Sequence, residues 1–162
     1  MELSIIIYLK RFKLLNDEKN DIACLINKTH NSYYHLHIFP DKELEEIKFE
    51  PITIIYGGNG SGKTTLLNII AASLKASKKT FYDSGNLFDS YVEECRFSMD
   101  FDDSECLEVK FIIFTHSLFL LSLKDALIYD LDEEPVTTKK WTELENVKVY
   151  YNFFKEYEDE FN

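Results

Sequence analysis

Residues 56–65 read YGGNGSGKTT, and this loop limits the possible folds more than any other stretch of the chain. Four of the chain's five glycines lie within it. The residues before it, ITIIY (52–56), are apolar and mostly β-branched, as in a strand that is covered on both faces of a mainly parallel sheet. The residues after it are apolar nearly all round and predict a buried helix that runs to about residue 76. The loop therefore joins a buried strand to a buried helix.

The loop has the pattern of a phosphate-binding loop, because Gly57 to Thr64 match G-x-x-x-x-G-K-[ST]. A chain that wraps around a triphosphate points successive backbone N–H groups inward, which requires small residues and some φ angles open mainly to glycine. We expect Lys63 to reach the β- and γ-phosphates of ATP and the Thr64 hydroxyl to bind Mg²⁺. The rest of the cradle would be Gly57, Gly58, Asn59, Gly60, Ser61, Gly62 and Thr65. The alternative is a plain glycine-rich turn.

Composition bears on the partners and the compartment. A net charge of -11 disfavours sequence-independent binding of nucleic acid, which needs clustered Lys and Arg. Cys24, Cys95 and Cys106 lack the paired spacing of a zinc site and are typical of reduced thiols. No stretch reaches the roughly 18 apolar residues of a membrane span, and we find no leader cleavage site. We expect a cytoplasmic protein without a membrane partner.

The chain length of 162 residues suits a single α/β domain over residues 1–162. Apolar patterns predict an antiparallel N-terminal strand pair, later strands, short helices and an amphipathic C-terminal helix. A capping box of Thr142 and Glu145 is expected to start that last helix. We interpret Trp141 and the aromatic residues of 150–161 as core. The expected strands are 3–15, 33–39, 52–56, 95–101, 110–116 and 126–132, and the short helices are 86–94 and 117–125.

Two segments resemble a known family. YGGNGSGKTTLLNIIA resembles the phosphate loop of ATP-binding-cassette ATPases, in the soluble branch that includes RecF-like, chromosome-maintenance-type and bacterial AAA family ATPases. KFIIFTHSLFLLSLKDALIYDLDE is similar to the segment where a buried strand ends in the family's switch histidine. His116 takes that position, and Leu118 stands where the family usually has Pro. The resemblance implies a P-loop NTPase-like fold, ATP and Mg²⁺ as cofactors, and His116 and Lys63 as catalytic residues.

The resemblance breaks between residues 101 and 110. Family members carry there a helical lobe, a serine-glycine signature and a strand that ends in carboxylates, whereas here Phe101 runs through DDSECLEV into Lys110. The resemblance thus implies a truncated cassette core, with a phosphate-loop half (1–100) and a switch-histidine and C-terminal-helix half (110–162). Without the signature and the carboxylate strand, we expect ATP hydrolysis to be weak or absent.

Several alternatives stay open. Asp100, Asp102 and Asp103 could replace the missing carboxylates, although a solvent-facing turn is the simpler interpretation. His35 and His37 have metal-compatible spacing on one strand but no third ligand nearby. Beside an ATP-binding protein, the chain could be a non-catalytic interaction module or remnant that docks onto a full-length relative. The resemblance also implies a homodimer, although the segments that form the family's interface are the missing ones. A phosphotransferase is disfavoured, because the chain has only two arginines, Arg11 and Arg96.

Overall fold

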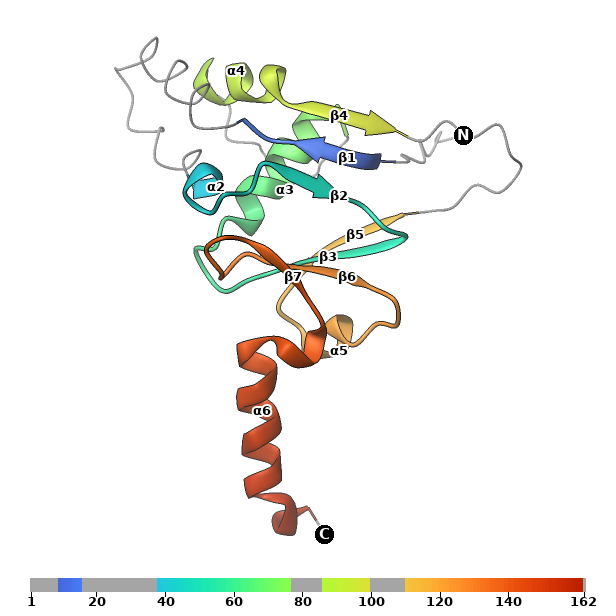
Figure 1. Ribbon diagram of the computed structural model, residues 1–162, viewed down its shortest axis with the longest axis vertical. Coiled ribbons are helices and arrows are strands. Elements are labelled where there is room, and N and C mark those ends of the chain that lie inside the picture. The colour runs from blue at the N-terminus through green and yellow to red at the C-terminus, as the bar shows by residue number, and fades with distance from the viewer. Residues whose placement is uncertain (1–8, 16–37, 77–85, 100–109, 162) are drawn as a thin grey trace, which may run out of the picture.

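The computed structural model describes residues 9–15, 38–76, 86–99 and 110–161, and Figure 1 shows how these parts are arranged. The N-terminal elements are β1 (Leu9–Lys13), α2 (Ile38–Asp41), β2 (Glu46–Lys48), β3 (Ile52–Tyr56), α3 (Lys63–Ser73), α4 (Asn86–Glu94) and β4 (Arg96–Met99). The C-terminal elements are β5 (Phe111–Thr115), α5 (Leu118–Leu121), β6 (Leu127–Asp130), β7 (Thr137–Lys139), the 3₁₀ turn η2 (Trp141–Glu143), α6 (Glu145–Glu156) and the 3₁₀ turn η3 (Glu158–Glu160).

The described strands form two sheets. One is antiparallel with the order β2-β1-β4, and the other has the order β5-β3-β6-β7. In the second sheet, β3 pairs in parallel with β5 and with β6, while β7 adds an antiparallel edge. The predicted α/β class, with parallel strands around the glycine loop and antiparallel pairing at the N-terminus, agrees with this arrangement.

The partner of the first strand differs from the prediction. We expected β1 to pair with residues 33–39, but Ile38 and Phe39 belong to the short helix α2, and residues 33–37 lie outside the described part. The partners of β1 are β2 and β4. Pro40 lies in α2 and not at the end of a strand. This is possible because proline is tolerated in the first turn of a helix. β2 has three residues, too few to show a periodic pattern.

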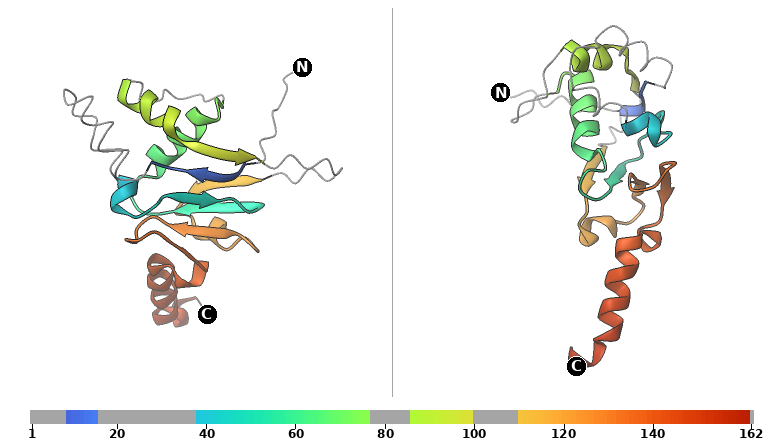
Figure 2. Two further views of the ribbon diagram at one scale, coloured as in Figure 1. Left: turned by 45° about the horizontal axis from the view of Figure 1, so that its top comes forward. Right: turned by 90° about the vertical axis from the view of Figure 1, so that its left-hand side faces the viewer.

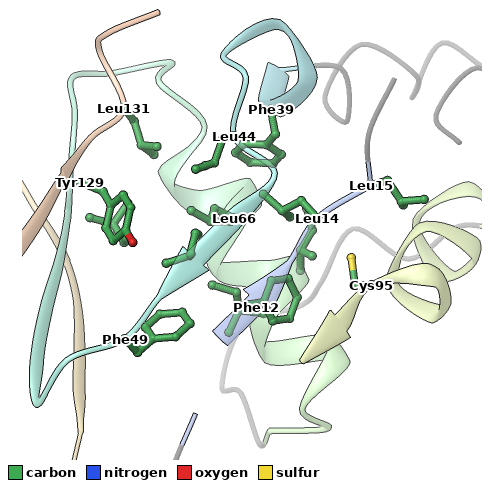
Figure 3. Close-up of a cluster of buried hydrophobic side chains, with 14 of the residues drawn as sticks. Phe12, Leu14, Leu15, Phe39, Leu44, Phe49, Leu66, Cys95, Tyr129 and Leu131 are labelled. Atoms are coloured by element: carbon green, nitrogen blue, oxygen red, sulfur yellow. The ribbon is translucent and has the colours of Figure 1, made fainter. Parts of the chain in front are cut away.

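The main hydrophobic core lies between the two sheets, α2, α3 and α4 (Figure 3). Phe12 of β1, Phe39 of α2 and Leu66 of α3 are fully buried in it. The Tyr129 hydroxyl of β6 accepts a hydrogen bond from the Lys48 N–H of β2 at 2.9 Å, which links the second sheet to the first. The predicted buried helix after the glycine loop is confirmed, although it ends at Ser73 and leaves Leu67 partly exposed.

A second apolar cluster covers the opposite face of β3. Successive strand side chains point to opposite faces, so Ile55 joins the main core while Ile54 and Tyr56 join the second cluster. Leu121 of α5 and the residues that begin α6, Leu144 and Val147, complete this second cluster.

Helix α6 projects away from the two sheets as a single helix (Figures 1 and 2). Val147 is its only buried residue. The prediction that Trp141 and the aromatic residues of 150–161 form core is therefore wrong, because no described element packs on most of this helix. The Thr142–Glu145 capping box is also wrong: Leu144 is the N-cap of α6, and Glu143 instead accepts the Lys140 N–H at 2.9 Å.

Candidate phosphate-binding site

Three parallel strand ends meet where the glycine loop begins. Tyr56, the last residue of β3, is in register with Thr115 of β5 on one side and with Asp130 of β6 on the other. Residues that follow these strands therefore share one edge of the sheet. In open α/β sheets, ligands bind outside the carboxyl ends of parallel strands. The sheet thus places Gly57 and His116 at the edge where a ligand is expected.

Three glycines of the loop lie where a side chain would be strained or obstructed. Gly60 has φ 84° and Gly62 has φ 96°, in the left-handed region that favours glycine. A Cβ on Gly62 would also come within 3.1 Å of Ile38 in α2. At Gly57 a Cβ would collide with the Ser61 side chain. The crowding of glycine into this loop therefore has a physical reason at each of these positions.

Lys63 crosses the loop that precedes it. Its Nζ donates hydrogen bonds to the carbonyls of Gly57 and Gly58, both at 2.5 Å, and lies 3.4 Å from the Ser61 hydroxyl. Lys63 is also the first residue of α3, and the N-cap, Gly62, makes no side-chain capping bond. The first N–H groups of a helix have no intrahelical partner and carry partial positive charge. An ammonium group and these N–H groups thus lie together at one end of α3.

Asp132 holds the start of the loop, and our sequence analysis missed it. Both of its carboxylate oxygens accept the Gly58 N–H at 2.8 Å. Asp132 follows β6, so this contact joins residues 74 positions apart in the chain. The available signal was the strand 126–132 itself, because a strand parallel to 52–56 would bring its C-terminal residues to the glycine loop.

Asp130 is the buried carboxylate beside this contact, with 4% of its surface exposed. It ends β6, which pairs with β3 beside the glycine loop, and it follows apolar residues. One of its oxygens accepts the Asp132 N–H at 3.1 Å, and the other lies 3.4 Å from Lys139 Nζ. Both oxygens are therefore engaged by the protein.

Hydrogen bonding and burial shift the pKa values of three groups around Asp130. Hydrogen bonding to Glu133, with the nearby charge of Asp130, raises the pKa of Lys139. The pKa of Glu133 is lowered by hydrogen bonds from Lys139 and from Thr137. Burial raises the pKa of the Tyr56 hydroxyl, which accepts a hydrogen bond from the Asn146 amide at 2.7 Å. This last contact ties the start of α6 to the strand that enters the loop.

The remaining predicted site residues are only partly brought together. Thr64 is exposed and Thr65 half-buried, both in the first turn of α3. His116 is exposed directly after β5, and the next turn is held by the Ser117 N–H, which donates to the Thr115 hydroxyl at 3.0 Å. Asn59 is exposed at the tip of the loop. The alternative residues His35, His37, Asp100, Asp102 and Asp103 lie outside the described part of the chain.

The described ranges give little support for a metal site or a reactive cysteine. Within them, no group of three or more His, Cys, Asp and Glu residues is placed to hold a metal ion. Burial raises the pKa of the Cys95 thiol to about 12, which keeps this cysteine protonated. None of the helices in these ranges is long and apolar enough to cross a bilayer. Cys24 and Cys106 are not among the described residues.

Comparison with known families identifies one family for this chain. A family model described as an AAA domain matches residues 31–158, which is most of the chain. The chain therefore belongs to the AAA domain family, and this membership indicates a nucleotide-binding function of the ATPase type. Neither the curated proteins nor the solved structures gave a match.

Proposed function

We propose that the chain binds Mg-ATP through Gly57 to Thr65, in a truncated core of the cassette type. The observation that carries this proposal is the start of α3, where Lys63 and helix N–H groups without a side-chain cap lie next to a loop of left-handed glycines. Such a helix start is suited to an anion because its N–H groups and its dipole both favour negative charge. The first turn carries no acidic residue that would oppose this.

Each residue of the loop has a defined role in the proposal. The Lys63 ammonium group would exchange the carbonyls of Gly57 and Gly58 for phosphate oxygens. The Thr64 hydroxyl would supply one protein ligand to Mg²⁺, which typically takes one or two protein ligands and completes its shell with phosphate oxygens and water. The bound metal ion would neutralise phosphate charge. The main chain from Asn59 to Thr65 would supply further donors.

We further propose that hydrolysis is weak or absent. Phosphoryl transfer to water requires a carboxylate on the metal side and a group that positions the attacking water. Asp130 is the buried carboxylate at the edge of the sheet, but it is occupied by Lys139 and by the Asp132 N–H. His116 is left as the candidate for sensing the γ-phosphate, since it follows the strand next to β3.

The experiment that tests binding is a calorimetric titration with Mg-ATP. We expect saturable binding that is lost in Lys63→Ala and kept in Lys155→Ala, which removes an equal charge on the exposed helix α6. Phosphate release should stay near the background rate. Loss of binding in both variants, or no binding by the folded wild type, would refute the proposal. Robust turnover that Lys63→Ala abolishes would refute the weak-hydrolysis part alone.

The role of His116 is tested by comparing two nucleotides. We expect His116→Ala to weaken the binding of Mg-ATP several-fold while leaving the affinity for Mg-ADP unchanged, because the difference between them is the γ-phosphate. An equal loss for both nucleotides would instead mean that His116 supports the shape of the loop.

A second candidate function is an interaction module that docks onto a full-length relative. The observation that favours it is the exposed aromatic surface of α6. A homodimer would use the same surface. Co-purification with a full-length relative distinguishes docking onto that relative from a homodimer.

A further inference from the structure

The exposed face of α6 has the spacing of a helix-pairing surface. Its members, called here the aromatic stripe, recur mostly at intervals of three and four residues, so they line one side of α6 and continue into the tail that follows Glu156. Lys148, Asn152 and Lys155 lie on the opposite side. The stripe consists of Val147, Tyr150, Tyr151, Phe154, Tyr157 and Phe161.

The stripe is largely exposed beyond its first residue. Tyr151 is 65% exposed and Phe161 is 71% exposed. The ring contacts here join Phe153 to Phe154 and to Tyr157, and Phe154 to Phe161. With about 200 Å² for a fully exposed aromatic side chain, the stripe exposes about 550 Å², and Phe153 beside it adds about 100 Å². The largest apolar patch on a typical monomer is about 300–600 Å². A patch of this size marks an interaction surface.

We propose that the occupant of this surface is a second copy of the chain, with the two α6 helices packed antiparallel. A standard stable interface buries about 800 Å² on each partner, and the stripe supplies most of that area. The exposed side chains of Phe119, Leu120 and Trp141 lie at the base of α6 and can supply the rest. In Figure 1 and in the right view of Figure 2, α5 lies beside the start of α6.

Charge selects the antiparallel orientation. The end of the helix and its tail carry Glu156, Glu158, Asp159 and Glu160, so a parallel pair would place two acidic clusters together. In the antiparallel pair, each acidic tail lies near the partner's α6 start, where Lys140 and Lys148 balance Glu143 and Glu145 and Leu144 provides no side-chain cap. Negative charge is favourable at a helix start, and antiparallel helix dipoles attract.

The intervals of the stripe also define the register. The positions 147, 150, 154, 157 and 161 follow the alternation of three and four residues found at the a and d positions of coiled coils. Antiparallel pairing of such positions sets Tyr150 opposite the partner's Phe154, and Val147, which is buried against its own chain, marks the edge of the contact. Tyr151 then lies close to its own copy near the two-fold axis. This surface is separate from the phosphate-binding loop.

Sedimentation equilibrium of the full chain tests the proposal. We expect a dimer mass for the wild type at tens of micromolar, and a monomer for Phe154→Glu, with at least a tenfold weaker association. The matched control Asn152→Glu adds the same charge on the polar side of α6 and should remain a dimer. Circular dichroism should show unchanged helix content in both variants.

Two outcomes would overturn the proposal: a monomeric wild type at these concentrations, including one that associates only with a full-length relative, or equal masses for the two variants. Lys63→Ala should dimerise like the wild type, so failure of nucleotide binding is separable from failure of dimerisation.

A disulfide test addresses the orientation, in a background with the three native cysteines replaced by alanine. Tyr150→Cys mixed with Phe154→Cys should cross-link faster than either alone. Faster linkage of either variant alone would contradict the antiparallel pair.

Discussion

Helices α3 and α6 are similar in length, with 11 and 12 residues, yet their apolar residues have opposite environments. Ile69 and Ile70 of α3 pack between two sheets, whereas Phe153 and Phe154 of α6 are each about half exposed. The starts of the helices differ as well. A left-handed glycine precedes α3, and the buried, extended Leu144 precedes α6. An apolar helix face read from the sequence therefore does not show whether another part of the same chain covers it.

The largest expected effect is a difference in stability loss between substitutions on the apolar faces of α3 and α6. Ile69→Ala should lower the free energy of unfolding by about 2–5 kcal/mol, because it leaves a cavity in the main core. Phe154→Ala should change it by less than about 0.5 kcal/mol at protein concentrations too low for association. Chemical denaturation measures both values. Similar losses in the two variants would mean that α6 is covered within one chain.

The next effect concerns how α3 begins. Gly62→Ala should cost about 1–2 kcal/mol, because alanine is disfavoured at φ 96° and its Cβ would approach Ile38. Gly58→Ala is the matched control, since a Cβ there would meet Asp132 at an ordinary 3.6 Å. Thermal unfolding should separate the two variants. Equal stability would show that the left-handed conformation at Gly62 is not required.

A smaller effect is expected where β6 supports the loop. Asp132→Ala removes the acceptor of the Gly58 N–H and should weaken Mg-ATP binding about fivefold, as one net hydrogen bond contributes roughly 1 kcal/mol. Asp132→Asn keeps one acceptor oxygen and should recover most of the affinity in a calorimetric titration. If the asparagine variant binds as poorly as the alanine variant, the negative charge of Asp132 matters rather than the hydrogen bond.

The smallest effect is a pH dependence in the β6–β7 hairpin. Hydrogen bonds from Lys139 and Thr137 lower the pKa of Glu133 in the folded state below its unfolded value. The stability from Glu133 is therefore present above the unfolded pKa and is lost as the pH falls through the folded pKa. Melting temperatures of the wild type and Glu133→Gln should differ slightly at neutral pH and converge in acid. A difference that persists in acid would contradict this assignment.

Local patterns predicted the region around the glycine loop well. The strand 52–56 has the predicted bounds, because a run of apolar, β-branched residues between Pro51 and the glycines specifies it locally. The helix 86–94, farther along the chain, also has the predicted bounds. The pairing of β1 was predicted incorrectly, since three residues of β2 carry too little pattern to reveal a partner. Asp132 was missed for a different reason. Its role comes from parallel pairing across a long separation in sequence: the strand 126–132 was predicted, but its local pattern does not show which strand it pairs with.

The sequence alone led to the proposal of a phosphate loop, because glycine spacing, a lysine and a hydroxyl residue match that chemistry within ten consecutive positions. It also determined that the last helix is amphipathic. Only the tertiary structure decided that Asp132 supports the loop and that the aromatic stripe is exposed. Periodicity shows which side of a helix is apolar, whereas burial depends on whether another element reaches that side, and the described elements do not reach most of α6.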